Sequence, residues 1–176
     1  MEQAGPHQVA SGGPPPGAAK PKARIYEINL DEASISHLNA NVNHEREVAI
    51  FDLLEDNRFR IVDGVDGPYQ LRLAISEEQR LVMQIGTAEN ENVVTHVLSL
   101  TPFKRIIKDY YLICDSYYAA IKTGPPSRVQ AIDMGRRGLH DEGSHKLLER
   151  LEGKADLDFD TARRLFTLIS VLYWKG

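Results

Sequence analysis

The repeat of apolar residues changes once along this chain, and that change restricts the fold more than any other feature. Between residues 69 and 100 apolar and polar side chains alternate, as in YQLRLAIS and RLVMQIG. A period of two is typical of strands that bury one face. From residue 101 the period lengthens to three or four, which is typical of amphipathic helices. We therefore predict an α+β fold with helices packed on a mainly antiparallel sheet.

About four strands are expected. The first is RIYEINL (24–30), and the connector RFRIVDGVDGP (58–68) precedes the next two. YQLRLAIS and RLVMQIG are separated by the short reversal SEEQ, which favours an antiparallel hairpin. VVTHVLSL (93–100) then completes a meander.

One helix is expected before the hairpin, within NHEREVAIFDLLEDN. Asn43 can cap it, because an asparagine side chain accepts hydrogen bonds from free N–H groups in the first turn. Val48, Phe51 and Leu54 share a face, so we expect them to be buried.

A block of three or four helices is expected after the sheet. Thr101 is predicted to cap the first, which ends at Gly124-Pro125-Pro126. Ser127 begins a capping box, SRVQ, for a second helix that continues in one or two pieces. The last helix is predicted to begin near Asp158, with its inward face formed by Ala162, Leu165, Phe166, Ile169, Leu172 and Tyr173.

Composition restricts the class of protein. Residues 1–23 include nine Gly or Pro, which predicts a disordered tail before a single α+β domain over 24–176. A net charge of −4 makes nucleic-acid binding unlikely. The single cysteine, Cys114, allows no intrachain disulfide and lies on an apolar helix face, where a core role is expected. We find no secretory signal and no apolar run long enough to span a membrane, and expect a cytoplasmic protein without a cofactor.

Four stretches together resemble a known family: AIFDLLEDN, LSLTPFKRIIKDYYLICDSYYAAI, AIDMGRRGLHDEGSHKLLERLEGK and DFDTARRLFTLISVLYWKG. They are similar to Uncharacterised Protein Family 0262, a set of small bacterial proteins, over roughly residues 24–176. The resemblance implies a bacterial, cytosolic protein. It supplies no activity, substrate or cofactor.

The stretch IDMGRRGLHDEGSHKLLER is unusual for a helix because it contains three glycines, Gly135, Gly138 and Gly143. Each costs about 0.8–1 kcal/mol inside a helix relative to alanine. Close helix packing, a helix break or backbone exposed to a ligand could explain them. A break near Gly135–Gly138 would place free N–H groups beside Arg136 and Arg137, which suits phosphate or carboxylate.

Other interpretations of this stretch remain open. The arginines could instead pair with Asp133, Asp141 or Glu142, or contact a partner protein. His140 and His145 are five residues apart, which does not match the zincin spacing. Ser144 is interpreted as a helix N-cap rather than a nucleophile.

We expect a non-catalytic binding, regulatory or adaptor module that recognises a small anionic ligand or an acidic protein surface. The candidate binding residues are Arg136, Arg137, His140, Glu142, His145, Arg163 and Arg164. The alternative is an enzyme in which the arginines clamp a phosphorylated or carboxylated substrate and a histidine moves protons. An enzyme requires a concave pocket where these groups converge, whereas a binding module could present them on a flat face.

Two further features have more than one interpretation. Tyr110, Tyr111, Tyr117 and Tyr118 form either a tyrosine-rich core or an interface, with a homodimer through Tyr111 and Tyr118 as one form of the latter. His96 alternates onto the inner side of its strand, where a hydrogen-bonded core histidine is expected.

Overall fold

The computed structural model describes residues 21–31 and 39–174. Most of the predicted disordered tail, 1–23, lies outside the described residues. The elements in chain order are β1 (Ile25–Leu30), α1 (Ala40–Glu55), β2 (Phe59–Ile61), β3 (Tyr69–Ile75), β4 (Arg80–Gly86), β5 (Val94–Ser99), the 3-10 turn η2 (Thr101–Phe103), α2 (Lys104–Thr123), α3 (Pro126–Leu151), β6 (Ala155–Leu157) and α4 (Phe159–Tyr173).

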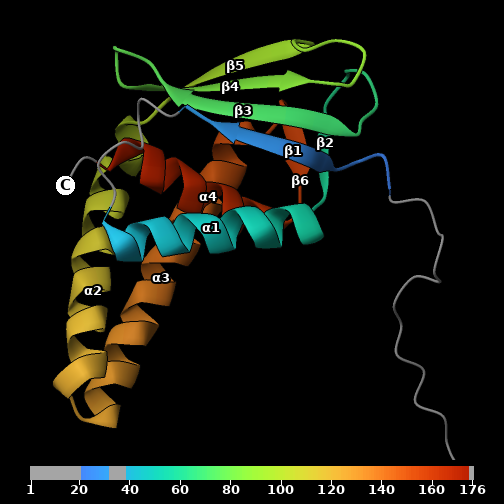
Figure 1. The fold of residues 1–176 in the computed structure, drawn as a ribbon. Helices are drawn as coiled ribbons and strands as arrows, with labels where there is room; N and C mark the ends of the chain where they lie inside the picture. Colours follow the sequence, from blue (N-terminus) through green and yellow to red (C-terminus); the bar gives the residue numbers. More distant parts are fainter. Residues whose placement is uncertain (1–20, 32–38, 175–176) are drawn as a thin grey trace, which may run out of the picture.

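The α+β prediction is confirmed. Four strands form a sheet in the order β1-β3-β4-β5, in which the predicted hairpin and meander are antiparallel. β1 pairs with β3 in parallel, because the chain returns through α1 before entering β3. Figure 1 shows the helices on one face of this sheet and none on the other.

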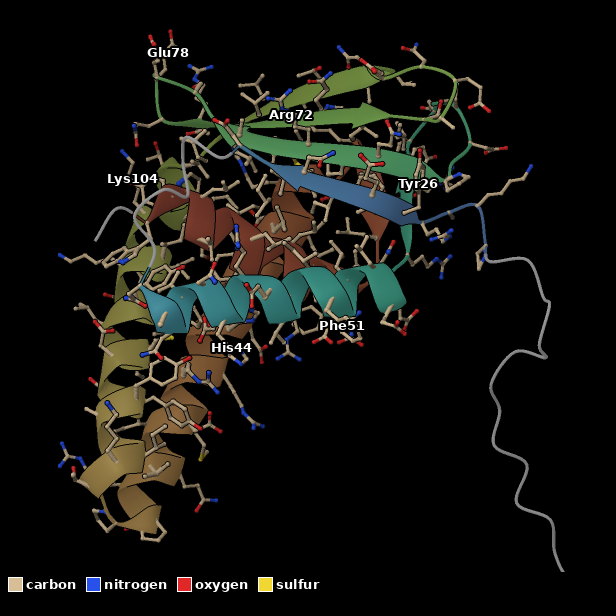
Figure 2. The ribbon with its side chains drawn as sticks, viewed as in Figure 1. Tyr26, His44, Phe51, Arg72, Glu78 and Lys104 are labelled. Carbon is tan, nitrogen blue, oxygen red and sulfur yellow. The ribbon has the colours of Figure 1, made fainter. Side chains whose placement is uncertain are left out.

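Apolar and polar side chains alternate along the strands, and the helices cover the apolar face of the sheet. Leu71, Leu73 and Met83 point towards the helices and are fully buried. Arg72 and Val97 lie on the open face, where Figure 2 shows Arg72 above the sheet. His96 lies opposite Met83 on the inner side, but its Nε2 has no hydrogen-bond partner in the described part of the chain, contrary to expectation.

A second, two-stranded sheet was not predicted. β2 and β6 pair antiparallel, with Phe59 opposite Leu157 and Ile61 opposite Ala155. The prediction that residues 58–68 form a connector is therefore wrong for the first part of the segment, which forms β2. Strands of three residues are too short to show a period, and their pairing joins segments far apart in the chain.

The prediction of which face of α1 is buried is also wrong. Val42, Ala49 and Leu53 are buried, whereas Val48 and Phe51 are exposed. The N-cap is Asn39, whose side chain accepts from the Val42 N–H, and not Asn43. Both stripes have helical spacing, so only docking against β1 and α4 decides which is buried.

The helical block has one central helix and a protruding pair. α4 lies beneath the sheet, and most of its side chains are buried. Its predicted cap is confirmed, because Asp158 accepts from the Thr161 N–H. α2 and α3 extend away from the sheet side by side (Figure 1). Neither Thr101 nor Ser127 caps a helix as predicted, since α3 begins at Pro126 and η2 precedes α2.

α3 is one continuous helix of 26 residues, which excludes the break near Gly135–Gly138 that the sequence left open as one alternative. A Cβ atom at Gly135 would lie 2.7 Å from Ile113 Cδ1 of α2, and one at Gly143 would overlap the Phe166 ring of α4. These two glycines permit close helix packing, and nothing lies within 4 Å of a Cβ at Gly138. Ser144 is buried inside the helix and donates to the His140 carbonyl, so its predicted role as an N-cap is wrong.

Candidate binding groove

A groove of about 790 Å³ lies among the four helices. Figure 1 shows α1 crossing the helical block at the level where α2 and α3 leave the sheet. We call this space the helical groove. Its lining residues used below are His44, Glu45, Val48 and Asp52 of α1; Tyr110, Tyr117, Tyr118 and Ile121 of α2; Arg136, Arg137 and His140 of α3; and Asp160, Arg163, Arg164 and Thr167 of α4.

Five of the seven candidate residues line this groove: Arg136, Arg137, His140, Arg163 and Arg164. The other two lie outside it. Glu142 accepts a hydrogen bond from Arg105 of α2, with 2.8 Å between Oε1 and Nη2. His145 packs against the ring of Phe159, with ring centroids 4.6 Å apart. The two are engaged with other partners in the protein.

The contribution of α1 was missed by sequence reasoning. Glu45 was not among the candidate residues named from the sequence. In the structure its carboxylate enters the groove and accepts hydrogen bonds from two tyrosine hydroxyls, from Tyr118 at 2.9 Å and from Tyr110 at 3.2 Å. The Glu45 side chain is only 15% exposed. No local pattern predicts this contact, because it depends on how α1 docks.

The carboxylate of Glu45 ties three helices together. Arg136 Nη1 of α3 lies 3.8 Å from Glu45 Oε1, while both tyrosines belong to α2. Burial, followed by the negative charge of Glu45, raises the pKa of Tyr110 and of Tyr118 well above the usual range. Both hydroxyls therefore stay protonated and act as donors to Glu45.

Arg136 and Arg137 have different environments although they are adjacent. Arg136 donates to Asp133 Oδ1 at 2.8 Å, lies 4.4 Å from the centre of the Tyr117 ring, and is 24% exposed. Arg137 Nε lies 3.0 Å from Asp133 Oδ2, and its side chain is 70% exposed. The hydrogen bond from Arg136 is the largest cause of the lowered pKa of Asp133. Arg136 is a packed structural cation, whereas Arg137 extends into solvent.

The α4 arginines are less fully paired. Arg163 Nε lies 3.7 Å from Asp141 Oδ1, beyond hydrogen-bonding distance, and has no hydrogen-bond partner in residues 21–31 and 39–174. Arg164 donates through Nη1 to the carbonyl of Asp56 at the end of α1. Arg163 therefore keeps a donor that no described residue satisfies.

His140 lies on the groove wall as a neutral base. Its Nε2 is 2.7 Å from Thr167 Oγ1, and that hydroxyl donates to the Arg163 carbonyl at 3.2 Å. The Thr167 hydroxyl has one proton, so the tautomer of His140 depends on which of these two contacts that proton makes. Burial, followed by the charge of Arg163, lowers the pKa of His140 to about 4.

Nδ1 of His140 is buried and has no hydrogen-bond partner among the described residues. Nδ1 is an acceptor in the tautomer with the proton on Nε2 and a donor in the other tautomer. Two unsatisfied polar atoms, Nδ1 of His140 and Nε of Arg163, therefore belong to adjacent walls of the groove. Unsatisfied buried polar atoms are uncommon in folded proteins and call for a bound group or solvent.

The tyrosines named for a homodimer belong to internal packing. Tyr111 is buried and stacks on Trp174, with ring centroids 4.6 Å apart. Tyr118 lies in the groove and binds Glu45. The homodimer itself stays a prediction, but Tyr111 presents no surface for a second copy. Cys114 is buried, as expected.

Within the described ranges, no three or more His, Cys, Asp or Glu side chains are arranged to hold a metal ion. In the same residues, no helix combines the length and apolar character needed to cross a membrane.

The fold and the site define an α+β protein with an arginine-lined groove between its helices. The chain belongs to the Uncharacterised protein family UPF0262, whose sequence profile matches residues 22–175. This confirms the resemblance found in the sequence.

Relatives in other bacteria match nearly the whole chain. A UPF0262 protein of Xanthobacter autotrophicus is 57% identical over 90% of this chain and 96% of its own length. One of Mesorhizobium japonicum is 56% identical over 91% of this chain and 99% of its own length. One of Methylobacterium radiotolerans is 58% identical over 87% of this chain and 94% of its own length. No solved structure matches the chain.

Proposed function

We propose that this protein is a non-catalytic binding module that takes an anionic group of its ligand or partner into the helical groove. The observation that carries the proposal is the convergence of Arg137, Arg163 and Arg164, from two helices, on one concave space. A volume of about 790 Å³ is within the range usual for ligand sites.

The partly exposed side chain of Arg163, 43% of which is open to solvent, supports an anion in particular. A guanidinium offers five N–H groups in a fixed fork, and a carboxylate or phosphate can accept two of them at once. The exposed Arg137 is held by one carboxylate oxygen, so donors remain for a ligand. The four lining arginines outnumber the three lining carboxylates, Glu45, Asp52 and Asp160. Asp133 and Asp141 pair with three of these arginines, so an anion would be held by guanidinium hydrogen bonds and not by a net positive charge of the groove.

A second candidate function is an enzyme acting on a phosphorylated or carboxylated substrate. Its support is specific, because the arginines and His140 converge on a concave space. His140 is nevertheless a weak base near neutral pH, since its pKa is lowered to about 4 and its Nε2 is bound to Thr167. These facts favour binding over catalysis.

The proposal is tested by the melting temperature of the full chain with inorganic phosphate, citrate or tetraglutamate. A ligand at 100 times its dissociation constant adds about 2.7 kcal/mol to the free energy of unfolding. At least one of these anions should stabilise the wild type and lose its effect in Arg137→Gln/Arg163→Gln.

The matched control is Arg72→Gln/Arg128→Gln, which removes two exposed arginines that do not line the groove. It should keep the full response. The proposal is rejected if no anion stabilises the wild type, or if both double variants respond equally.

A further inference from the structure

The helical groove has an apolar lip that recognition of a simple anion does not require. Val48 of α1 and Ile121 of α2 line the groove and are 43% and 50% exposed. Phe51, nearly one turn after Val48 on α1, lies outside the groove in a separate apolar hollow with Ile50 and Leu54, and is 66% exposed. Figure 2 shows Phe51 on the side of α1 that faces away from the sheet. Large apolar side chains that gather at one exposed place mark sites of protein contact.

The apolar and cationic groups belong to different walls. The apolar lip comes from α1 and α2, whereas Arg137 comes from α3 and Arg163 from α4. A ligand that uses both walls must itself carry apolar groups on one side and negative charge on another. A helix with two such faces meets this description, and helices commonly bind in grooves formed by other helices.

The lining carboxylates argue against a phosphorylated metabolite. Asp52 and Asp160 face the same space as the arginines and would repel a doubly charged phosphate. Single carboxylates spaced along a protein segment can lie against the arginines and avoid these aspartates. A phosphate group would also leave the apolar lip in water.

We propose, on the basis of the binding function above, that the occupant of the groove is an acidic amphipathic helix of a protein partner. Its acidic side chains bind Arg137 and Arg163, and its apolar side chains cover Val48, Phe51 and Ile121. The walls of the groove and this helix are complementary in both charge and polarity.

The experiment selects peptides from a displayed dodecapeptide library on the full-length protein. Selected peptides are synthesised, and their affinity is measured by fluorescence anisotropy. We expect acidic residues together with apolar residues at a spacing of three or four. Val48→Ser/Phe51→Ser and Arg137→Gln/Arg163→Gln should each weaken binding at least tenfold.

Two controls separate the groove from the rest of the surface. Val97→Ser and Arg72→Gln alter exposed side chains on the open face of the sheet and should leave affinity unchanged. The four substituted residues lie at least partly in solvent, and circular dichroism of each variant checks that the fold is retained. Inorganic phosphate is added as a competitor to identify peptides that use only the anion site.

The outcomes distinguish this inference from the binding function on which it rests. If binding depends on the arginines but is unchanged in Val48→Ser/Phe51→Ser, or is fully displaced by phosphate, the amphipathic helix is rejected and anion binding is retained. If neither double variant weakens binding, both proposals fail for those peptides. If no peptide is enriched, the helix is rejected, and the melting experiment alone decides on anion binding.

Discussion

Gly143 of α3 packs directly against the ring of Phe166 of α4, so that a single added methyl group would overlap three atoms of that ring. Phe166 is fully buried and also contacts the rings of Tyr110 and His140. Helices α3 and α4 can therefore approach closely at this point only because position 143 has no side chain. The groove wall that carries His140 depends on this approach.

Gly143→Ala should destabilise the protein, whereas Gly138→Ala should stabilise it. Overpacking a core costs about 1–3 kcal/mol, which should exceed the helix-propensity gain of alanine and leave a net loss of up to about 2 kcal/mol. At Gly138 no atom opposes the methyl group, so a gain of about 0.8–1 kcal/mol is expected. Urea denaturation of both variants measures the two changes. Effects of the same sign would contradict this account of the glycines.

Glu45→Gln should lower the free energy of unfolding by about 1–3 kcal/mol. The amide nitrogen cannot accept a hydrogen bond, so one of the two hydroxyls of Tyr110 and Tyr118 loses its acceptor. The control is Glu47→Gln, an exposed position on the same helix, where a change below about 0.5 kcal/mol is expected. Thermal and urea unfolding give both values, and equal losses would show that Glu45 does not hold the helices together.

Arg136→Gln should destabilise the protein by about 2 kcal/mol, because it removes a charged hydrogen bond to Asp133 and the contact with Tyr117. Arg137→Gln should change stability by less than about 0.5 kcal/mol, since its ion pair is exposed. The comparison uses neighbouring positions and the same substitution. A larger loss at 137 than at 136 would contradict the assigned roles.

The stability of the protein should fall between pH 6.5 and pH 4.5 because of His140. Its pKa is lowered to about 4 in the folded protein, by burial and then by Arg163; the charge of Asp141 opposes this shift and that of Arg136 adds to it. The unfolded state, with a pKa near 6.5, binds more protons in this range, so lowering the pH favours unfolding. From pH 7 to pH 5 the loss should reach about 2 kcal/mol.

Unfolding of His140→Gln over the same range isolates this contribution, since the variant should show a flatter dependence on pH. His145→Gln, an exposed position outside the groove, should keep the wild-type dependence. NMR titration of the His140 ring should show no protonation until the pH approaches 4. A midpoint near 6.5 would mean that His140 is not buried as a neutral side chain.

Local patterns predicted much of the fold because they report on single elements. The hairpin of β3 and β4, the Asp158 cap and the buried stripe of α4 are each specified within a short stretch of sequence. The arginines of the groove were also found, because cations beside glycines stand out in a helix. The sequence left close packing and a helix break open as explanations of the glycines, and close packing at Gly135 and Gly143 leaves α3 unbroken.

The sequence by itself determined the α+β class, the order of most elements and the family, because periodicity, caps and turns act between near neighbours. Only the tertiary structure decided that β1 lies parallel beside β3, that β2 meets β6, and that α1 buries Ala49 while exposing Phe51. It also brought Glu45 against Tyr110, Tyr118 and Arg136. These outcomes join residues far apart in the chain, where several pairings satisfy the same local pattern and the packing of the whole core selects one.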